Sequence, residues 1–225
     1  MPQQITAQDF YNRLVQSGII NSTGNITFNL NGISIQIESK DSIGNMIQEW
    51  IQSWAMHNNI YLRANPLTQE FPDFYLSQYN DRNFLEIKSF DFNAGANFDV
   101  ANFEAYFRSL IVQPKKLDAD YLIFAYTINN GVLSIEHVWL KKIWEICTNS
   151  ANWDLKMQVS HGIVKNIRPI SFSQNARFTP FDNKILFLEA IQGVLNQYTT
   201  TANIYSNWLN DFRTAYQTAT GNVLT

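Results

Sequence analysis

The chain has 225 residues, a formal net charge of −3 at pH 7 and a hydrophobic fraction of 45%, which excludes a disordered chain and suits one domain with a sizeable core. It contains no apolar run near the roughly 20 residues that a membrane helix needs, and its first residues lack the basic and apolar segments of a secretory signal. The single cysteine, Cys147, excludes an internal disulfide. We therefore expect a cytoplasmic protein without a membrane partner.

The first quarter of the chain carries signals for two helices and a hairpin. Thr6 is a candidate N-cap for a helix that ends near Gly18. Residues 26–37 alternate polar and apolar side chains around Asn31-Gly32, which predicts a β-hairpin with a tight turn. A second helix is predicted to begin at position 41 or 42. Its buried face is expected to comprise Ile43, Ile47, Trp50, Ile51 and Trp54.

The rest of the chain alternates strand and helix signals. Two short strands are predicted around 74–76 and 84–87, and residues 120–126 form an apolar run that is typical of a strand buried on both faces. The other predicted elements are a helix over 98–110, a strand over 132–135, a short helix or strand–helix junction over 138–146, a strand over 163–170 and helices over 184–198 and 204–218. This order predicts an α/β fold, a mixed β-sheet flanked by helices, in a single domain over residues 1–225 with a C-terminal helical part over 182–225.

Two carboxylates and one ammonium lie in the two short strand-like segments. Alternation along a strand puts Glu86 and Lys88 on one face and Ile87 on the other, and a neighbouring strand can set Asp73 opposite Glu86. Two carboxylate oxygens suit Mg²⁺, which prefers oxygen ligands, and the Ile87 main-chain carbonyl is a candidate third ligand. Such an ion activates water for phosphodiester hydrolysis, and Lys88 could stabilise the charge that develops in the transition state.

The spacing alone is a weak signal, because Pro-Asp and Glu-x-Lys are common by chance. Charged side chains on edge strands explain the same residues. The apolar, strand-like context of both segments favours a metal-dependent nuclease, and Glu49 on the preceding helix is a candidate for a further catalytic acid.

The DNA-binding candidates lie in two places. Residues 155–181 contain no Asp or Glu, and arginine is the usual reader of guanine in the major groove. The candidates in this segment are Lys165, Asn166, Arg168 and Arg177. Phosphate contacts, or an ordinary solvated face, are the alternatives. Asn93 and Asn97, in the loop after the second strand, could also reach the DNA groove, although a plain connecting loop explains them too.

The acid, acid and lysine set resembles that of the PD-(D/E)xK nuclease superfamily, with Asp73, Glu86 and Lys88 in the motif positions and Glu49 on the helix before the sheet. Six segments, of which three contain these motif residues, are similar to the NgoBV/NlaIV family of type II restriction endonucleases. They are Ile47-Gln48-Glu49-Trp50, Phe71-Pro72-Asp73-Phe74, Leu85-Glu86-Ile87-Lys88-Ser89-Phe90, Leu117 to Phe124, Trp139-Leu140-Lys141-Lys142 and Asn166-Ile167-Arg168-Pro169. The resemblance therefore covers most of the chain.

This resemblance implies Mg²⁺-dependent cleavage of double-stranded DNA at a short palindrome, GGNNCC in the family members that share these motifs. It also implies a homodimer and products with 5′-phosphate ends. The glycines nowhere form a phosphate-binding loop, so no nucleotide cofactor is expected. Two rival functions stay open: a repair or junction-resolving nuclease of the same superfamily, and a non-catalytic DNA-binding protein.

Overall fold

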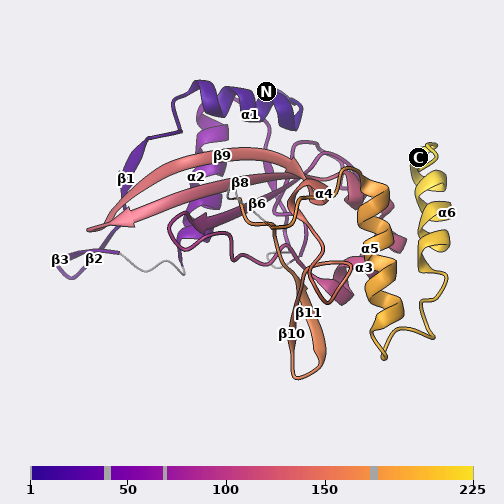
Figure 1. Cartoon of the computed structure of the whole chain (residues 1–225). Helices are drawn as coiled ribbons and strands as arrows, with labels where there is room; N and C mark the ends of the chain where they lie inside the picture. Colours follow the sequence, from indigo (N-terminus) through magenta and orange to yellow (C-terminus); the bar gives the residue numbers. More distant parts are fainter. Residues whose placement is uncertain (1, 38–41, 68–69, 173–176, 225) are drawn as a thin grey trace. The chain divides into compact units, whose positions relative to one another are not determined.

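The computed structural model describes residues 2–37, 42–67, 70–172 and 177–224, and these residues form two compact units (Figure 1). The first unit comprises Met1–Ala96 and Asp120–Lys141. The second unit comprises Asn97–Ala119 and Lys142–Thr225. Each unit is therefore assembled from segments that are distant in the sequence, and the single domain expected over the whole chain stays a prediction.

A mixed six-stranded sheet forms the framework of the first unit. Its strands are β1 Thr23–Asn25, β4 Arg63–Ala64, β5 Phe74–Tyr75, β6 Phe84–Asp91, β8 Asp120–Asn129 and β9 Val132–Lys142. They follow the order β1-β9-β8-β6-β5-β4. Strands β6 and β8 run parallel, whereas β5 pairs antiparallel with β6. The apolar run of β8 is buried from Tyr121 to Tyr126, as expected for a central strand covered on both faces.

Two helices, α1 (Ala7–Gln16) and α2 (Ile43–His57), share one hydrophobic core with this sheet. Thr6 caps α1, because its side-chain oxygen accepts a hydrogen bond from the Asp9 N–H at 3.0 Å. The rings of Phe10 and Trp54 join the two helices edge to face, with centroids 5.3 Å apart. The sheet contributes alternate side chains of its two parallel strands to this core: Leu85, Ile87, Leu122 and Phe124.

The buried face of α2 differs from the prediction at one position. Trp50 is 42% exposed, so its predicted burial is wrong. The side chains at strict i, i+4 spacing from Ile43 to Ala55 occupy the buried stripe. Trp50 lies at the edge of that stripe, where its ring stacks on Trp54 with centroids 6.4 Å apart. Of the two predicted starting positions of this helix, position 41 lies outside the described residues.

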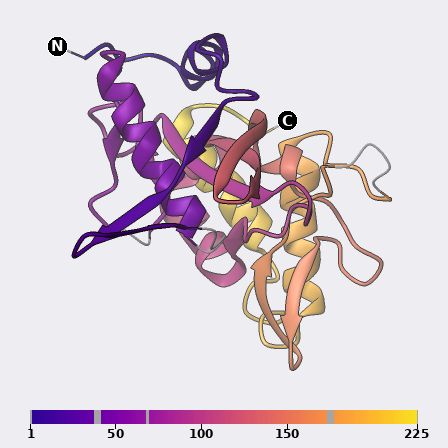
Figure 2. The ribbon, with the colours of Figure 1, turned by 90° about the vertical axis from the view of Figure 1, so that its left-hand side faces the viewer.

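A separate hairpin, β2 (Thr27–Leu30) and β3 (Ile33–Gln36), follows β1 (Figure 2). Its turn, Asn31-Gly32, has φ values of 48° and 78°, which are the left-handed values that a type I′ turn requires. The predicted hairpin is confirmed. Its register places four apolar side chains on one face, namely Phe28 paired with Ile35 and Leu30 paired with Ile33.

The second unit combines a small sheet with helices. Its strands are β7 Ala101–Asn102, β10 Met157–Ser160 and β11 Ile163–Ile167, in the order β10-β11-β7. Its helices are α3 Phe103–Val112, the 3₁₀ helix η2 Pro114–Asp118, α4 Ile143–Ile146, α5 Lys184–Gln197 and α6 Trp208–Thr220. Trp208 anchors α6 on α3, because its indole N–H donates to the Phe107 carbonyl at 3.1 Å. None of the helices in the described ranges has both the length and the apolar character to cross a bilayer.

Three predictions for the second unit need correction. The helix predicted from position 98 begins at Phe103, because Asn102 caps it by accepting the Ala105 N–H at 3.0 Å and the residues before the cap are extended. The last helix begins at Trp208 and not at position 204. Strand β10 is absent from the prediction, because its short sequence forms a strand only through antiparallel pairing with β11.

Candidate active site

Strand pairing sets the candidate acids side by side in the first unit. Strand β5 pairs antiparallel with β6 through Phe74 and Leu85. The next step of this register puts Asp73 opposite Glu86. Asp73 lies just before β5, where the strand leaves its carboxylate free to turn toward β6. The sequence prediction that a neighbouring strand sets these two acids opposite each other agrees with this register.

Short polar contacts link these acids to the strand and to the lysine. The Asp73 N–H donates to Glu86 Oε2 at 3.1 Å, and Asp73 Oδ2 accepts a hydrogen bond from the Ile87 N–H at 2.8 Å. Lys88 Nζ lies 2.8 Å from Glu86 Oε1. Glu86 is buried and Lys88 is half-buried, so water screens this ion pair less than it screens a surface pair. Asp73, Glu86 and Lys88 therefore lie together, and their catalytic roles stay predictions.

The surroundings of Asp73 oppose its ionisation. Burial is the largest cause and the Glu86 charge adds to it, and together they raise the pKa of Asp73 from 3.8 to about 7. The Ile87 N–H, the Lys88 ammonium and a hydrogen bond with the Gln48 side chain lower this pKa without cancelling the effect of burial. A cation beside this carboxylate would favour its ionised form.

A hollow of about 300 Å³ opens beside Asp73 in the first unit. Gln48, Glu49 and Gln52 on α2 border it, together with Glu70. Glu49 is exposed and shares this hollow with Asp73, so the helix does bring it to the candidate site. Sequence reasoning missed Gln48, whose only signal was its place next to Glu49; the sequence does not tell which of these neighbours turns its side chain toward Asp73.

Another hollow of the first unit, of about 460 Å³, lies apart from Asp73. It is lined by residues just after α1, by β1 and the residue before β2, by α2 and by strands β8 and β9, and none of these lining residues is acidic or basic. Its wall includes Ile26 at the base of the hairpin and Trp50 on α2. Without a titratable group it offers no chemistry for hydrolysis.

The donor set beside the smaller hollow suits a hard divalent cation. Asp73 and Glu86 offer carboxylate oxygens, and Mg²⁺ is usually held by one or two carboxylates and several waters. Within the described ranges, no group of three or more His, Cys, Asp or Glu side chains could hold a metal ion. Protein ligation would thus rest on these two acids, with the Ile87 carbonyl as a third candidate, which fits Mg²⁺ better than the closed nitrogen and sulfur sites of zinc.

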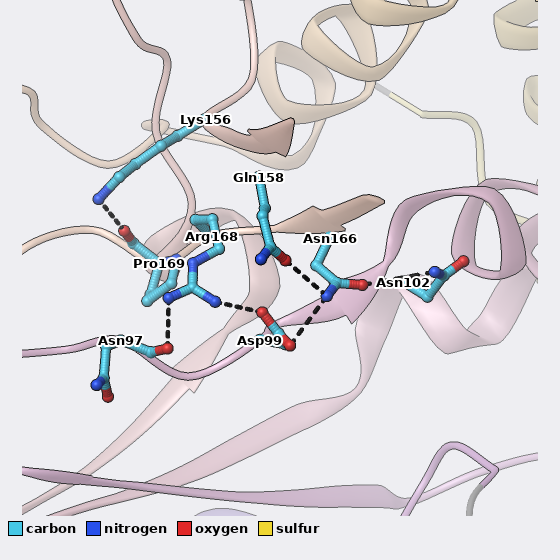
Figure 3. Close-up of polar contacts among 8 residues, drawn as sticks. All are labelled: Asn97, Asp99, Asn102, Lys156, Gln158, Asn166, Arg168 and Pro169. Carbon is cyan, nitrogen blue, oxygen red and sulfur yellow. Dashed lines mark hydrogen bonds and ion pairs between the residues drawn. The ribbon is translucent and has the colours of Figure 1, made fainter. Parts of the chain in front are cut away.

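Three DNA-binding candidates meet in the second unit (Figure 3). Arg168 forms an ion pair with Asp99 through Nη1 and donates through Nη2 to the main-chain carbonyl of Asn97. Asn166 Nδ2 donates to the same carboxylate, Asp99 Oδ2, at 2.9 Å. The structure thereby brings Asn97, Asn166 and Arg168 together, with Asn97 contributing its main chain. Sequence reasoning missed Asp99, which joins them.

The other DNA-binding candidates are exposed and lie outside this network. Lys165 is on β11, and Arg177 holds its guanidinium 5.1 Å from the centroid of the Phe178 ring. Asn93 belongs to the first unit, in the turn after β6, where its N–H donates to Asp91 Oδ1 at 3.0 Å. Their roles in DNA binding stay predictions.

A mixed sheet that sets one acid opposite an acid and a lysine on the next strand is the arrangement expected of a restriction-endonuclease-like nuclease. The solved structure of NlaIV restriction endonuclease is similar to this chain, with a TM-score of 0.93 and 34% sequence identity over 99% of this chain and 93% of that chain. The predicted α/β fold is thereby confirmed.

The sequence comparisons give the family. The family model described as NgoBV restriction endonuclease matches residues 4–225. Type II restriction enzyme NlaIV of Neisseria lactamica is 36% identical over 219 residues, which cover 95% of this chain and 90% of that enzyme. Type II restriction enzyme NgoBV of Neisseria gonorrhoeae is 32% identical over 157 residues, which cover 69% of this chain and 90% of that enzyme. The chain belongs to the NgoBV restriction endonuclease family, and the prediction of a type II restriction endonuclease is confirmed.

Proposed function

We propose that this restriction endonuclease is a Mg²⁺-dependent cytoplasmic homodimer that cleaves double-stranded DNA at a short palindrome and leaves 5′-phosphate ends. The observation that carries the metal-dependent chemistry is the contact of Asp73, Glu86 and Lys88 on neighbouring strands. The palindrome GGNNCC is the proposed target, because the sequence motifs resemble family members with that site. DNA would be held by Lys165, Asn166, Arg168, Arg177, Asn93 and Asn97.

The proposed catalytic roles follow from the positions of the side chains. Asp73 and Glu86 hold Mg²⁺, with the Ile87 carbonyl as a third ligand. The bound ion supplies a Lewis acid for the scissile phosphate and lowers the pKa of a water ligand. Lys88, held by Glu86 at 2.8 Å, orients the attacking water and stabilises the charge on the phosphate. Glu49, which borders the same hollow as Asp73, assists the acids.

The hairpin of the first unit supports the proposed homodimer. Its four apolar side chains, Phe28, Leu30, Ile33 and Ile35, are 50%, 66%, 69% and 50% exposed and share one face. Together they expose roughly 470 Å², taking about 200 Å² for a large side chain, which is more than half of one partner's share of about 800 Å² in a standard interface.

The charge of this segment favours a second copy as the partner of the hairpin. No charged residue occurs between Arg13 and Glu38, so the face lacks the lysines and arginines that DNA phosphates require. An uncharged apolar face can pack against its own copy without like-charge repulsion. A palindromic target requires such a two-fold dimer, because each protomer reads one half-site.

The test of the proposed function is digestion of a sequenced plasmid with Mg²⁺, followed by mapping of the fragment ends. Discrete fragments with 5′-phosphate ends at one recurring palindrome are expected, and Lys88→Ala should abolish them while retaining DNA binding. Structure-dependent nicking would instead indicate a repair or junction-resolving nuclease. Binding without any Mg²⁺-stimulated cleavage would indicate a non-catalytic DNA-binding protein, and unchanged cleavage by Lys88→Ala would reject the assigned site.

A further inference from the structure

We propose that Asp99 and Arg168 act as one unit that reads a single G·C base pair from the major groove, with Gln158 as an additional reader and Asn166 as the residue that positions them. This inference rests on the proposed function, because it requires a sequence-specific DNA target. It assigns a role to Asp99 and Gln158, which the sequence did not single out, and it changes the role of Asn166 from contact to support.

The four side chains form a continuous hydrogen-bonded row (Figure 3). Asp99 Oδ1 accepts a hydrogen bond from Arg168 Nη1. Asp99 Oδ2 accepts one from Asn166 Nδ2 at 2.9 Å. Asn166 Nδ2 also donates to Gln158 Oε1 at 3.0 Å. Both amide hydrogens of Asn166 are therefore used within the row. Asn166 holds its neighbours in place and has no amide hydrogen left for a base.

The backbone explains why these side chains meet. Asn166 on β11 lies in register with Asn102 on β7, whose segment carries Asp99 just before it. The β10–β11 register shifts between Met157 and Val159, so Gln158 sits at an irregularity that re-aims its side chain toward Asn166. The β10–β11 hairpin and the segment around Asp99, which are far apart in the sequence, thus present polar groups together.

Lys156 fixes the chain next to Arg168. Its Nζ donates to the Pro169 carbonyl at 2.8 Å, and the Arg168 N–H donates to the Lys156 carbonyl at 2.9 Å. Burial and the nearby Arg168 charge both lower the pKa of Lys156. The Lys156 ammonium is therefore bound to a main-chain carbonyl, and the Arg168 guanidinium is the basic group of the row.

The row is suited to reading bases more than to neutralising phosphates. Arg168 and Asp99 cancel each other's charge, which weakens attraction to the DNA backbone. The side chains of Arg168 and Asp99 are 26% and 49% exposed, and the Gln158 side chain is exposed as well. Directional donors and acceptors stay accessible on a sheet that orients them, and such groups supply base specificity.

The order of donor and acceptor matches one base pair. Guanine presents two acceptors, N7 and O6, and its paired cytosine presents the N4 donor beside them. Arg168 has five N–H donors, of which two contact Asp99 and Asn97. Its remaining N–H groups can donate to N7 and O6 of the guanine, while the adjacent Asp99 carboxylate accepts a hydrogen bond from N4 of the cytosine. An A·T pair would set the adenine N6 donor against Arg168 and the thymine O4 acceptor against Asp99, so the pair also rejects the wrong base.

The test measures binding of the full-length protein to a duplex that carries the mapped target, with Ca²⁺ in place of Mg²⁺. Each guanine is replaced in turn by 7-deazaguanine, which lacks the N7 acceptor, and each cytosine by N4-methylcytosine, whose methyl group blocks the groove-facing N4 hydrogen. At one base pair, both replacements should weaken wild-type binding by about 10-fold or more. Arg168→Ala should lose sensitivity to the guanine replacement, and Asp99→Asn should lose sensitivity to the cytosine replacement.

Two control variants make the result decisive. Asp182→Asn, an exposed acid of the same unit, should keep the wild-type pattern of sensitivity. Asp99→Glu, which retains an acceptor, should keep part of the cytosine sensitivity even where Asp99→Asn unfolds. If no base pair in the target is sensitive to both replacements in the wild type, the inference is overturned although cleavage and the proposed function stand. If no specific target exists, the proposed function and the inference fail together.

Discussion

The acid pair of the first unit and the polar row of the second unit place carboxylates in opposite surroundings. Asp73 is half-buried and Glu86 is buried, and burial together with repulsion by the Glu86 charge raises the pKa of Asp73 to about 7. Asp99 is about half exposed and lies against the Arg168 guanidinium. One carboxylate therefore lacks a sufficient counter-charge, and the other already has one within the chain.

This difference suits the two carboxylates to different roles, metal binding and base recognition. A buried carboxylate without enough positive charge around it favours an added cation, which metal-dependent hydrolysis requires. A carboxylate that is paired and exposed instead acts through the direction of its hydrogen bonds, which is what base recognition requires. Under the proposed function, charge-driven chemistry in the first unit is separate from hydrogen-bond recognition in the second unit.

The largest expected effect compares one residue from each region. Glu86→Gln should lower the single-turnover cleavage rate by about 1,000-fold or more with little change in DNA affinity, because it removes a proposed metal ligand. Arg168→Ala should weaken specific binding, with the cleavage rate of saturated enzyme much less affected. Asp81→Asn, an exposed acid in the β5–β6 turn, serves as the control. Equal losses of binding in both variants would contradict the separation.

The two faces of the hairpin allow a matched test of the dimer. The pair Leu30→Asp and Ile33→Asp should raise the dimer dissociation constant by at least about 100-fold, because burying unpaired charge is costly. Asn29→Asp with Ser34→Asp adds the same charge to the polar face and should leave the dimer intact. Sedimentation velocity distinguishes the two. Dissociation in both, or in neither, would place the dimer surface elsewhere.

The acid pair should also make metal-free stability depend on pH. Because the folded-state pKa of Asp73 is raised, the native state binds more protons than the unfolded state between about pH 4 and 7. Its contribution to stability is therefore lost as pH rises through that window, on the order of 4 kcal/mol in total. Urea unfolding in EDTA should show this loss in the wild type and in Asp81→Asn, and not in Asp73→Asn. Equal slopes for all three proteins would refute the origin assigned to it.

The smallest effect concerns the support of Asp73. Gln48→Ala removes a side-chain hydrogen bond that favours the ionised Asp73, so the Mg²⁺ concentration for half-maximal cleavage should rise about 10-fold. Gln52 borders the same hollow without that hydrogen bond, so Gln52→Ala is the control. The increase in the Mg²⁺ requirement of Gln48→Ala should be smaller at higher pH, where Asp73 ionises more readily. A change in DNA affinity without a change in metal requirement would assign Gln48 to the substrate.

Local patterns were sufficient to predict that Asp73, Glu86 and Lys88 lie together. Alternation on β6 fixed Glu86 and Lys88 on one face, and a short polar turn between two apolar segments made β5 and β6 neighbours. Asp73 opposite Glu86 follows from antiparallel pairing. None of these steps needs contacts between distant parts of the chain.

The polar row of the second unit depends on pairing between segments that are distant in the sequence, which explains why it was only partly predicted. Asp99 and Asn166 meet because β7 pairs with β11, and β7 is only two residues long in a segment that was predicted to be helical. Gln158 needs the irregularity in β10, a strand without a strong sequence signal. Trp50 was misassigned for a related reason, since helical spacing does not show where the buried stripe ends.

The most direct test of the acid pair is metal location. Crystals of the wild-type protein soaked in Mn²⁺, a stand-in for Mg²⁺ with an anomalous signal, should show a peak about 2.1 Å from carboxylate oxygens of both Asp73 and Glu86. Asp73→Asn with Glu86→Gln should abolish that peak and leave the fold unchanged. A peak held by other residues, or one that persists in the double variant, would contradict the account.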